Sequence, residues 1–217
     1  TAIALWFFNK NKVDVAILET GLGGRLDSVS YCKPDLIVFT HIALDHQHIL
    51  GNTIEDIAQE KAGAIKHRTH CISIRQKSSV ERILNKQAAL FNIKVEYISI
   101  SKNKYSSLNG SHQKINESLA IAAIKMLDYF KVKHDAIALG LSNVYWPGRM
   151  QLIKSMPSIF FDVAHNVSSF LAMIKFVDKL NIEGDKILIL ALQKHKDINL
   201  AIEAICSTFD KIIFTQT

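Results

Sequence analysis

The chain has 217 residues, of which 48% are hydrophobic and 21% charged, and its formal net charge is +6. This composition is sufficient for a hydrophobic core and excludes a disordered protein. The longest clean apolar runs, near Ala4–Phe8 and Ile187–Leu192, are far too short to span a bilayer, so no membrane segment is expected.

The positive charge and the cysteines narrow the class of protein further. The charge suits an anionic ligand such as a nucleotide, although many small proteins are equally basic for solubility alone. The sequence has no dense basic run with interleaved aromatic residues, so we expect no nucleic-acid partner. Cys32, Cys71 and Cys206 are widely separated and form no Cys-x-x-Cys zinc pattern. They predict free thiols in a reducing compartment, and therefore a cytoplasmic protein.

Short apolar, β-branched runs alternate with helical patterns along the chain. Strands are predicted at Val13–Leu18, Asp35–Thr40, Cys71–Ile74, Val95–Ile100, Ile159–Val163, Ile187–Leu192 and Lys211–Thr215. Helices are predicted at Ala2–Lys10, Ile54–Lys66, Ser79–Phe91, His112–Phe130, Asp135–Leu141, Ser168–Leu180 and Ile198–Thr208. Strands that are apolar on both faces and separated by helices indicate an α/β fold with a mostly parallel sheet flanked by helices.

A domain boundary is predicted at Trp146-Pro147-Gly148, which breaks both helix and strand. It separates a first domain, residues 1–146, from a second domain, residues 147–217. The second domain has only about 70 residues, which is short for a doubly wound unit, so we expect it to be incomplete. Thr1 is not an initiator methionine and already reads as part of a helix, so we expect the chain to be a piece of a longer protein.

Polar side chains follow four of the predicted strands, at the edge of the sheet where ligands bind in open parallel folds. These side chains are Glu19; Asp45 and His46; Asp162, His165 and Asn166; and Lys194, Lys196 and Asp197. Four such clusters favour a shared ligand-binding cleft over coincidence.

Glu19 and His46 are candidate metal ligands. A carboxylate beside a neutral imidazole can hold a hard divalent cation such as Mg²⁺ or Mn²⁺. The alternative is that Glu19 caps a turn and that His46 is an ordinary surface histidine. We expect Asp45 to orient a loop rather than to bind metal directly.

The glycine-rich segment Gly21–Asp27 reads G-L-G-G-R-L-D. It lacks the Gly-Lys-[Ser/Thr] of a Walker A loop, and its spacing does not match G-x-G-x-x-G. One interpretation is a tight turn that lets the backbone approach a phosphate or metal, with Arg25 supplying charge. The other is an ordinary glycine turn after a strand.

Lys61 interrupts an apolar helical stripe. The stripe has helical spacing and comprises Ile54, Ile57, Ala58, Lys61, Ala62 and Ile65. Thr53 and Asp56 resemble a capping pair that starts this helix. Lys61 either snorkels, with its ammonium group in water, or has a pKa that burial lowers, which leaves a neutral amine able to react or bind.

Asn116 and Arg149 are candidate nucleotide ligands. Asn116 ends the sequence H-Q-x-x-N near the start of a helix, and its amide can donate to and accept from an adenine edge. Asparagine at a helix start is, however, usually a cap. Arg149 directly follows the Trp146–Gly148 breaker and is placed to reach a phosphate.

Taken together, these segments resemble the folylpolyglutamate synthase/dihydrofolate synthase family of the Mur ligase superfamily over essentially the whole chain. The motifs that carry the resemblance are E-T-G-L-G-G-R-L-D (Glu19–Asp27), L-D-H (Leu44–His46), L-G-N-T-I-E-D-I-A-Q-E-K-A-G-A-I-K (Leu50–Lys66), H-Q-x-x-N (His112–Asn116), P-G-R (Pro147–Arg149) and D-V-A-H-N (Asp162–Asn166).

The resemblance implies a truncated central ATPase domain followed by part of a Rossmann-like α/β domain. It implies a monomeric, ATP-dependent ligase that joins the carboxylate of dihydropteroate or folate to the amine of L-glutamate. ATP would phosphorylate the carboxylate, the amine would attack the acyl phosphate, and phosphate would leave. This reaction requires mainly charge neutralisation and positioning from the protein.

The resemblance also implies roles for individual residues. Glu19 and His46 match Mg²⁺ ligands, and Lys61 matches a lysine that CO₂ carbamylates, a reaction that requires a neutral amine. Asn116, Arg149 and Asp162 match positions that contact ATP. His165 matches a catalytic position near the phosphates and ribose, and Lys194 and Asp197 resemble a later family loop only loosely.

The main departure from the family is the P-loop, and two alternative functions remain. The family's P-loop is absent from residues 1–217, so we expect a polypeptide of these residues alone not to turn over ATP. The first alternative is a metal-dependent phosphohydrolase built on Asp45, His46, His48 and His41. The second is a non-catalytic nucleotide-binding fragment.

Overall fold

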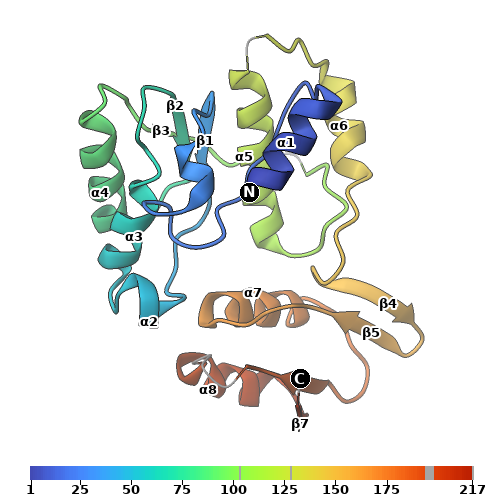
Figure 1. The fold of residues 1–217 in the computed structure, drawn as a ribbon. Coiled ribbons are helices and arrows are strands. Elements are labelled where there is room, and N and C mark those ends of the chain that lie inside the picture. The colour runs from blue at the N-terminus through green and yellow to red at the C-terminus, as the bar shows by residue number, and fades with distance from the viewer. Residues whose placement is uncertain (103, 128, 194–197, 217) are drawn as a thin grey trace. The chain divides into compact units, whose positions relative to one another are not determined.

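The computed structural model describes residues 1–102, 104–127, 129–193 and 198–216, which form two compact units (Figure 1). Unit 1 contains Thr1–Ile98 and Met126–Asp128, and unit 2 contains Ser99–Lys125 and Tyr129–Thr217. The predicted polar cluster at Lys194, Lys196 and Asp197 lies outside the described residues.

Unit 1 is built around a parallel sheet of three strands in the order β1-β2-β3. The strands are β1 (Leu36–Phe39), β2 (His70–Ser73) and β3 (Glu96–Tyr97). Helix α3 (Ile54–Ala62) connects β1 to β2, and α4 (Ser78–Ala89) connects β2 to β3. The two helices pack against each other on one side of the sheet (Figure 1). Parallel strands require such crossovers, so the predicted α/β class is confirmed.

The core of unit 1 lies between this sheet and its two helices. Its fully buried members include Ile57 and Ile65 from the predicted apolar stripe and Val80 and Leu84 from α4. The remaining elements of unit 1 are short or peripheral: α1 (Ala2–Asn11), the 3₁₀ helix η1 (Ser28–Tyr31) and α2 (Gln47–Leu50). Helix α1 has no buried residue.

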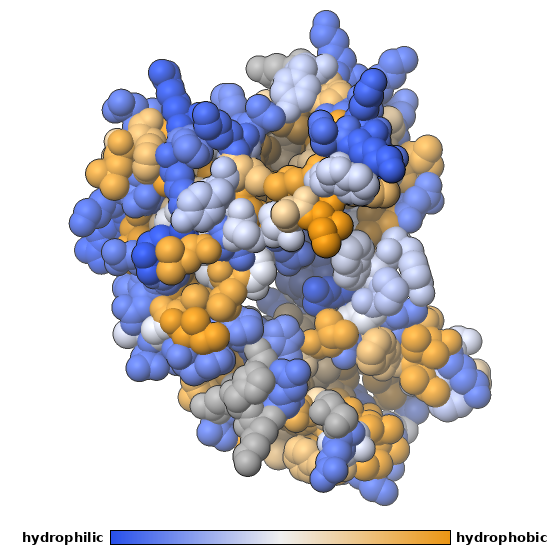
Figure 2. Space-filling model, in the orientation of Figure 1, coloured by the Kyte–Doolittle hydropathy of each residue, from blue (hydrophilic) through white to orange (hydrophobic). Residues whose placement is uncertain are grey.

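The strand predicted at Val13–Leu18 is absent, and this prediction was wrong. The segment is irregular, and Val13, Val15 and Ile17 are 43%, 46% and 91% exposed. Its apolar sequence is typical of a buried central strand, but a strand also needs a neighbour to pair its backbone groups. Strand β1 is an edge of the three-stranded sheet, and in the described part of the chain no further strand extends it. Exposed hydrophobic side chains are visible in several separate groups in Figure 2.

Unit 2 contains a helical part and a small α/β part. Its helices are α5 (Ser111–Met126, ending one residue inside unit 1), α6 (His134–Ser142), α7 (Val167–Val177) and α8 (Asn199–Thr208), and its strands are β4 (Gln151–Ser155), β5 (Ser158–Phe161), β6 (Ile187–Ala191) and β7 (Lys211–Thr215). Strands β6 and β7 are parallel and are connected by α8, which packs on α7. Phe170, Ile174, Ala201 and Ile205 form the centre of this core.

The strand predicted at Ile159–Val163 differs in extent and in partner. It is β5, which ends at Phe161 and pairs antiparallel with β4, a strand that was not predicted. Only Met156 and Pro157 separate the two strands, so they form a hairpin rather than a parallel pair with a crossover. Consequently Asp162 lies just beyond the end of the strand.

Two further findings concern the helices. Helix α3 ends at Ala62, four residues before its predicted end, and Gly63 follows it. Beyond this point the Ala64 and Ile65 N–H groups donate to carbonyl groups three residues back, so the helical i→i−4 bonds stop. None of the helices in the described ranges has the length and apolar character required to cross a bilayer.

The start of α3 has the predicted capping box, which leads to a stability prediction. The Thr53 side chain accepts from the Asp56 N–H at 3.1 Å, and the Asp56 carboxylate accepts from the Thr53 N–H at 3.1 Å. We expect Thr53→Ala to lower the free energy of unfolding by about 1 kcal/mol, because the Asp56 N–H loses its partner. Chemical denaturation measures the change, and Thr53→Ser, which retains the hydroxyl, should stay close to wild type. Equal losses in both variants would contradict the role of the cap.

Candidate functional site

The glycine-rich turn of unit 1 is held against the last turn of α3. The Arg25 N–H donates to the Glu60 carbonyl at 2.7 Å, and Arg25 Nε donates to Glu60 Oε1 at 2.9 Å. A Cβ atom on Gly24 would lie 2.7 Å from the Lys61 carbonyl oxygen. Glycine is therefore needed for the turn to approach α3 so closely. The expected charge of Arg25 is present, but it is paired with Glu60.

Asp27 organises the same turn from within. Its carboxylate accepts from the backbone N–H groups of Gly21, Leu22 and Val29 at 2.9–3.0 Å. Burial by itself would raise the pKa of Asp27, but the three hydrogen bonds outweigh it and the pKa is lowered. The segment is thus a self-supporting turn whose conformation depends on one ionised carboxylate.

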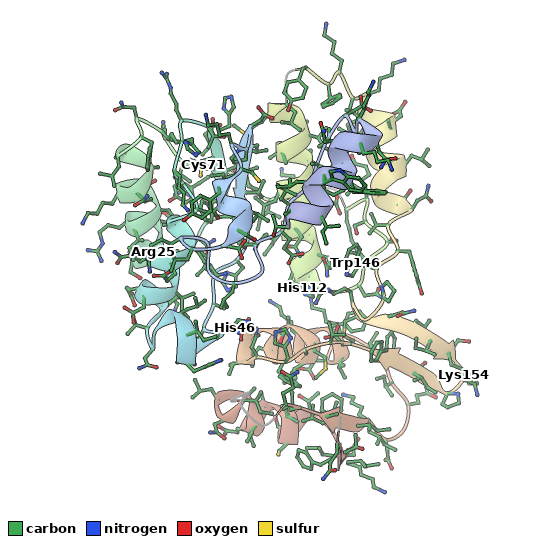
Figure 3. All side chains as sticks on the ribbon, viewed as in Figure 1. Arg25, His46, Cys71, His112, Trp146 and Lys154 are labelled. Carbon is green, nitrogen blue, oxygen red and sulfur yellow. The ribbon has the colours of Figure 1, made fainter. Side chains whose placement is uncertain are left out.

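Lys61 lies in the last turn of α3, next to this glycine turn. Its side chain is half-buried, and burial lowers its pKa, while the nearby carboxylate of Asp45 acts in the opposite direction. Asp45 Oδ1 also accepts from the His46 N–H at 2.8 Å, which is compatible with the predicted loop-orienting role of Asp45. His46 itself has a positive φ of 51° at the start of α2. Figure 3 labels His46 and Arg25 in this unit.

The proposed metal ligands do not form a closed site by themselves. Glu19 is exposed at the end of the irregular segment 13–20, and the His46 side chain is 40% exposed. The described residues contain no group of three or more His, Cys, Asp or Glu side chains able to hold a metal ion. Mg²⁺, however, keeps several waters and is usually held by one or two carboxylates together with substrate phosphates. An accessible carboxylate and imidazole are compatible with that mode of binding.

Unit 2 brings together the residues predicted to contact a nucleotide. Asp162, just after β5, accepts from the Met150 and Ala164 N–H groups at 2.8 Å each, which fixes its carboxylate. Burial lowers the pKa of His112, the Asp162 carboxylate acts in the opposite direction, and the Arg149 guanidinium acts with burial. The two charged groups are therefore close to the start of α5, where Figure 3 labels His112.

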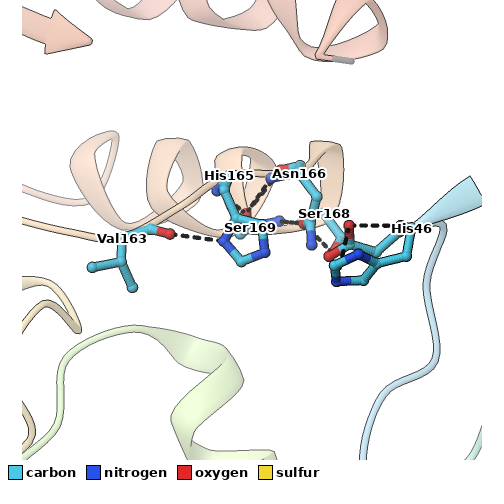
Figure 4. A network of polar contacts seen from close by, with 7 residues as sticks. His46, Val163, His165, Asn166, Ser168 and Ser169 are labelled. Carbon is cyan, nitrogen blue, oxygen red and sulfur yellow. Dashed lines mark hydrogen bonds and ion pairs between the residues drawn. The ribbon is translucent and has the colours of Figure 1, made fainter. Parts of the chain in front are cut away.

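The segment that leads into α7 is also ordered by hydrogen bonds (Figure 4). The Asn166 side chain accepts from the Ser169 N–H at 2.9 Å and completes a capping box with Ser169. His165 Nδ1 lies 3.0 Å from the Val163 carbonyl oxygen, and the His165 N–H donates to Ser169 Oγ at 3.0 Å. The imidazole of His165 is thereby held in an exposed position at a helix N-terminus, where an anion is favoured.

Asn116 is connected to His112 through a residue that was not singled out from the sequence. Asn116 Nδ2 donates to Gln113 Oε1 at 3.1 Å, and Gln113 Nε2 lies 3.0 Å from His112 Nε2. The Gln113 side chain is buried, whereas Asn116 is exposed. Asn116 lies in the second turn of α5 and does not act as its cap, so its amide is available to a ligand.

Sequence reasoning missed Asp27, Glu60 and Gln113. Asp27 had a signal, since an aspartate that closes a glycine-rich turn commonly accepts from its backbone. Glu60 had none, because its partner Arg25 lies 35 residues away in the chain. Gln113 is next to His112 and one helical turn from Asn116, but the sequence does not indicate that its side chain is buried between them. A shallow cavity of about 440 Å³ is lined by Arg75, Glu81, Asn85, Ile93, Lys94, Val95 and Tyr97, and contains none of the predicted site residues.

The fold and these residues by themselves define a class of protein. It is an α/β protein that presents a carboxylate, imidazoles and a half-buried lysine from the loops and helix ends of a parallel fold. A family model, the Mur ligase middle domain, matches residues 3–145, more than half of the chain. The chain therefore belongs to the Mur ligase family, as its resemblance indicated. The border predicted at residue 146 remains a prediction.

Curated relatives narrow the resemblance within this family. The dihydrofolate synthase/folylpolyglutamate synthase of Bacillus subtilis is 35% identical over 75% of this chain and 44% of its own length. The protein of the same name from Escherichia coli is 34% identical over 76% of this chain and 42% of its own length. The chain thus spans about half the length of the curated relatives it matches.

Solved structures agree with this grouping. The folylpolyglutamate synthase of Mycobacterium tuberculosis, complexed with ADP and AMPPCP, matches 99% of this chain and 55% of its own, with a TM-score of 0.88 and 27% identity. E. coli FolC in complex with DHPP and ADP matches 96% of this chain and 54% of its own, with a TM-score of 0.84 and 28% identity.

The contact between the glycine turn and α3 leads to a prediction with a matched control. Gly63 has ordinary helical backbone angles, but a Cβ atom there would lie 2.4 Å from Arg25 Cβ. We expect Gly63→Ala to lower the free energy of unfolding by about 1–3 kcal/mol through overpacking. In Gly140→Ala the new methyl group meets no atom within 4 Å in α6, and we expect a gain of about 0.5–1 kcal/mol. Denaturant titration compares the two, and a stabilising Gly63→Ala would contradict the close approach.

Proposed function

We propose that this protein is the central part of an ATP-dependent ligase that adds L-glutamate to dihydropteroate or to a folate. The observation that carries the proposal is Lys61: a lysine in an otherwise apolar helix stripe, half-buried, with its pKa lowered by burial. A surface lysine would remain protonated and unreactive towards CO₂ at neutral pH. A lowered pKa increases the fraction of neutral amine, which is the form that the family's carbamylation requires.

The carbamate would form directly on this side chain. The Lys61 ammonium first loses a proton to solvent. The lone pair of Nζ then attacks the carbon of CO₂, an N–C bond forms, one C=O π pair moves onto oxygen, and a second proton leaves the nitrogen. The cationic side chain thereby becomes a carboxylate at the end of α3, close to Asp45. A carboxylate there can support a metal ion and the phosphates of a nucleotide.

Unit 2 supplies the groups for the nucleotide. Asn116 would read the base, Arg149 would neutralise phosphate charge, and the fixed carboxylate of Asp162 would accept from ribose hydroxyl groups. His165, at the exposed start of α7, would lie near the phosphates as the catalytic imidazole. Solved structures of relatives in complex with ADP, AMPPCP or DHPP support small-molecule substrates of this kind.

The reaction that these groups would serve has two steps. The substrate carboxylate attacks the γ-phosphorus of ATP and ADP leaves, which gives an acyl phosphate. The amine of L-glutamate then attacks the acyl carbon, phosphate leaves, and an amide remains. The protein residues orient the partners and offset negative charge during both steps.

Mg²⁺ would neutralise phosphate charge in this reaction and polarise the phosphoryl group that is transferred. Glu19 and His46 are the residues that would hold it, since both side chains are accessible in unit 1. A monomeric state, a cytoplasmic location, and the choice between dihydropteroate and folate remain predictions of the sequence.

The two alternatives have less support. A phosphohydrolase would need a compact ligand cluster, and the described residues contain none with three donors. It also leaves Lys61, Asn116 and Arg149 without a role. A non-catalytic nucleotide-binding protein would share unit 2 but would have no use for a lysine with a lowered pKa.

The first prediction concerns Lys61. In the full-length protein we expect Lys61→Ala to abolish L-glutamate-dependent release of ADP, because the carbamate carboxylate is lost, and a short carboxylic acid should restore part of the activity. Independently of activity, ¹³C-bicarbonate should produce a carbamate carbon signal in the NMR spectrum of wild type and none in Lys61→Ala. Lys66→Ala, which removes a lysine of the same segment, serves as the control. Full activity in Lys61→Ala would refute the proposal.

The second prediction concerns Glu19. We expect Glu19→Gln to raise the Mg²⁺ concentration needed for half-maximal ADP release by at least about tenfold, because a neutral amide is a poorer ligand for a hard cation. The titration of Asp14→Asn, which removes a carboxylate from the same exposed segment, should match wild type. A Glu19→Gln titration that coincides with both would exclude Glu19 as a ligand.

A further inference from the structure

The start of α5 contains a short relay of side chains whose inner members, His112 and Gln113, have no role in the proposed reaction. His112, Gln113 and Asn116 are joined in series by the two contacts of 3.0 and 3.1 Å already described. Gln113, the middle member, is 5% exposed, so water cannot readily replace either of its partners. Asn116, the outer member, is exposed, so it is the member of the relay that a ligand can reach.

The inner member of the relay is held firmly in place. Gly110 has a φ of +98°, and a Cβ atom there would lie 2.6 Å from His112 Cε1 and 2.8 Å from His112 Nδ1. The backbone of Gly110 therefore packs directly on the imidazole edge. His112 Nδ1 is buried and, among the described residues, has no hydrogen-bond partner. The ring consequently presents Nε2, and not Nδ1, to Gln113.

The direction of the Asn116–Gln113 bond sets the direction of the other bond in the relay. Gln113 Oε1 accepts from Asn116, so the other end of the same amide is a donor. His112 Nε2 must then be an acceptor, which requires a neutral imidazole with its proton on Nδ1. With Nδ2 directed at Gln113, the amide of Asn116 has one defined orientation, and Oδ1 is placed for a ligand.

We propose that His112 and Gln113 are positioning residues that orient the Asn116 amide to accept from the 6-amino group of adenine and to reject purines with a 6-oxo group. The inference rests on the proposed function, because it takes Asn116 as the residue that meets the base. Adenine presents an N6 donor beside the N7 acceptor, which an asparagine amide matches through Oδ1 and Nδ2. A 6-oxo purine presents two acceptors and would face Oδ1 with its own oxygen.

The protonation of His112 is consistent with this arrangement. Burial lowers the pKa of His112, and the charged groups that face it are Asp162, which opposes the shift, and Arg149, which adds to it. At neutral pH the imidazole is therefore neutral, as the relay requires. Protonation would turn Nε2 into a donor, and the Gln113 amide would have to rotate, which would reverse Asn116 as well.

Nucleotide binding tests the proposal. The full-length protein is titrated with ATP and with inosine triphosphate, which carries a 6-oxo group, and the ratio of the two dissociation constants is compared between variants. We expect wild type to favour ATP, and Gln113→Met to reduce that ratio by roughly tenfold, since one bidentate contact contributes about this much discrimination. Gln113→Glu should retain the ratio, because a carboxylate still accepts from Asn116 Nδ2. Gln87→Met in unit 1, where Gln87 donates to the Ile65 carbonyl, is the matched control and should leave the ratio unchanged.

The ring nitrogens of His112 provide a readout that needs no nucleotide. Their ¹⁵N chemical shifts in wild type should identify the Nδ1-protonated neutral form at pH 7, and Gln113→Glu should raise the pKa of His112. If Gln113→Met does not fold, His112→Phe replaces it, because it also frees the Gln113 amide to rotate. An unchanged ratio in the folded relay variants, or a His112 protonated on Nε2, would overturn the relay while ATP binding persists. Failure of wild type to bind ATP would instead overturn the proposed function and this role together.

Discussion

The backbone contact between the glycine turn and α3 is the constraint on which the candidate site of unit 1 depends. The Arg25 N–H meets the Glu60 carbonyl at 2.7 Å, and Gly24 and Gly63 have no room for a side chain at this contact. A turn held this closely orders the segment that follows Glu19 and covers the end of the helix that carries Lys61. The carboxylate of Asp27 maintains the turn by accepting three backbone N–H groups. Glycine at these two positions therefore allows the turn to pack directly on α3.

Burial acts on two basic groups in the same direction, with different consequences. At Lys61 it lowers the pKa of an amine, and at His112 it lowers the pKa of an imidazole. In each case a carboxylate, Asp45 or Asp162, opposes the shift without reversing it. A neutral amine is a nucleophile, and a neutral imidazole is a hydrogen-bond acceptor. In the proposed function, the same physical cause prepares one group for covalent chemistry and the other for orienting an amide.

Unit 2 shows how loops that follow short strands can present ligand groups rigidly. Asp162 is fixed by two backbone N–H groups, and Asn166 closes a capping box at the start of α7. The relay through Gln113 fixes Asn116 in a similar way from the start of α5. In all three cases the side chain is held by backbone N–H groups or by a neighbouring side chain. Rigid support of this kind reduces the entropy lost when a ligand binds.

The sequence by itself determined the α/β class, most helices and strands, the capping box at Thr53 and the family. These follow from local periodicity, turn chemistry and motif order, which depend on residues near one another in the chain. The strand predicted at Val13–Leu18 was wrong, because an apolar run does not show whether a neighbouring strand is available to pair with it. Strand β4 was also missed, since its pairing depends on a two-residue connection to β5.

Only the tertiary structure decided what surrounds Lys61, Arg25 and Asn116. The helical stripe was compatible with a snorkelling lysine or with a buried one, and the structure shows a half-buried side chain whose pKa burial lowers. Arg25 pairs with Glu60, 35 residues away in the chain, which the sequence does not indicate. The orientation of Asn116 depends on His112, whose imidazole packs against the backbone of Gly110. Protonation and hydrogen-bond direction are set by what surrounds a side chain in space, and neighbours in the sequence determine that only in part.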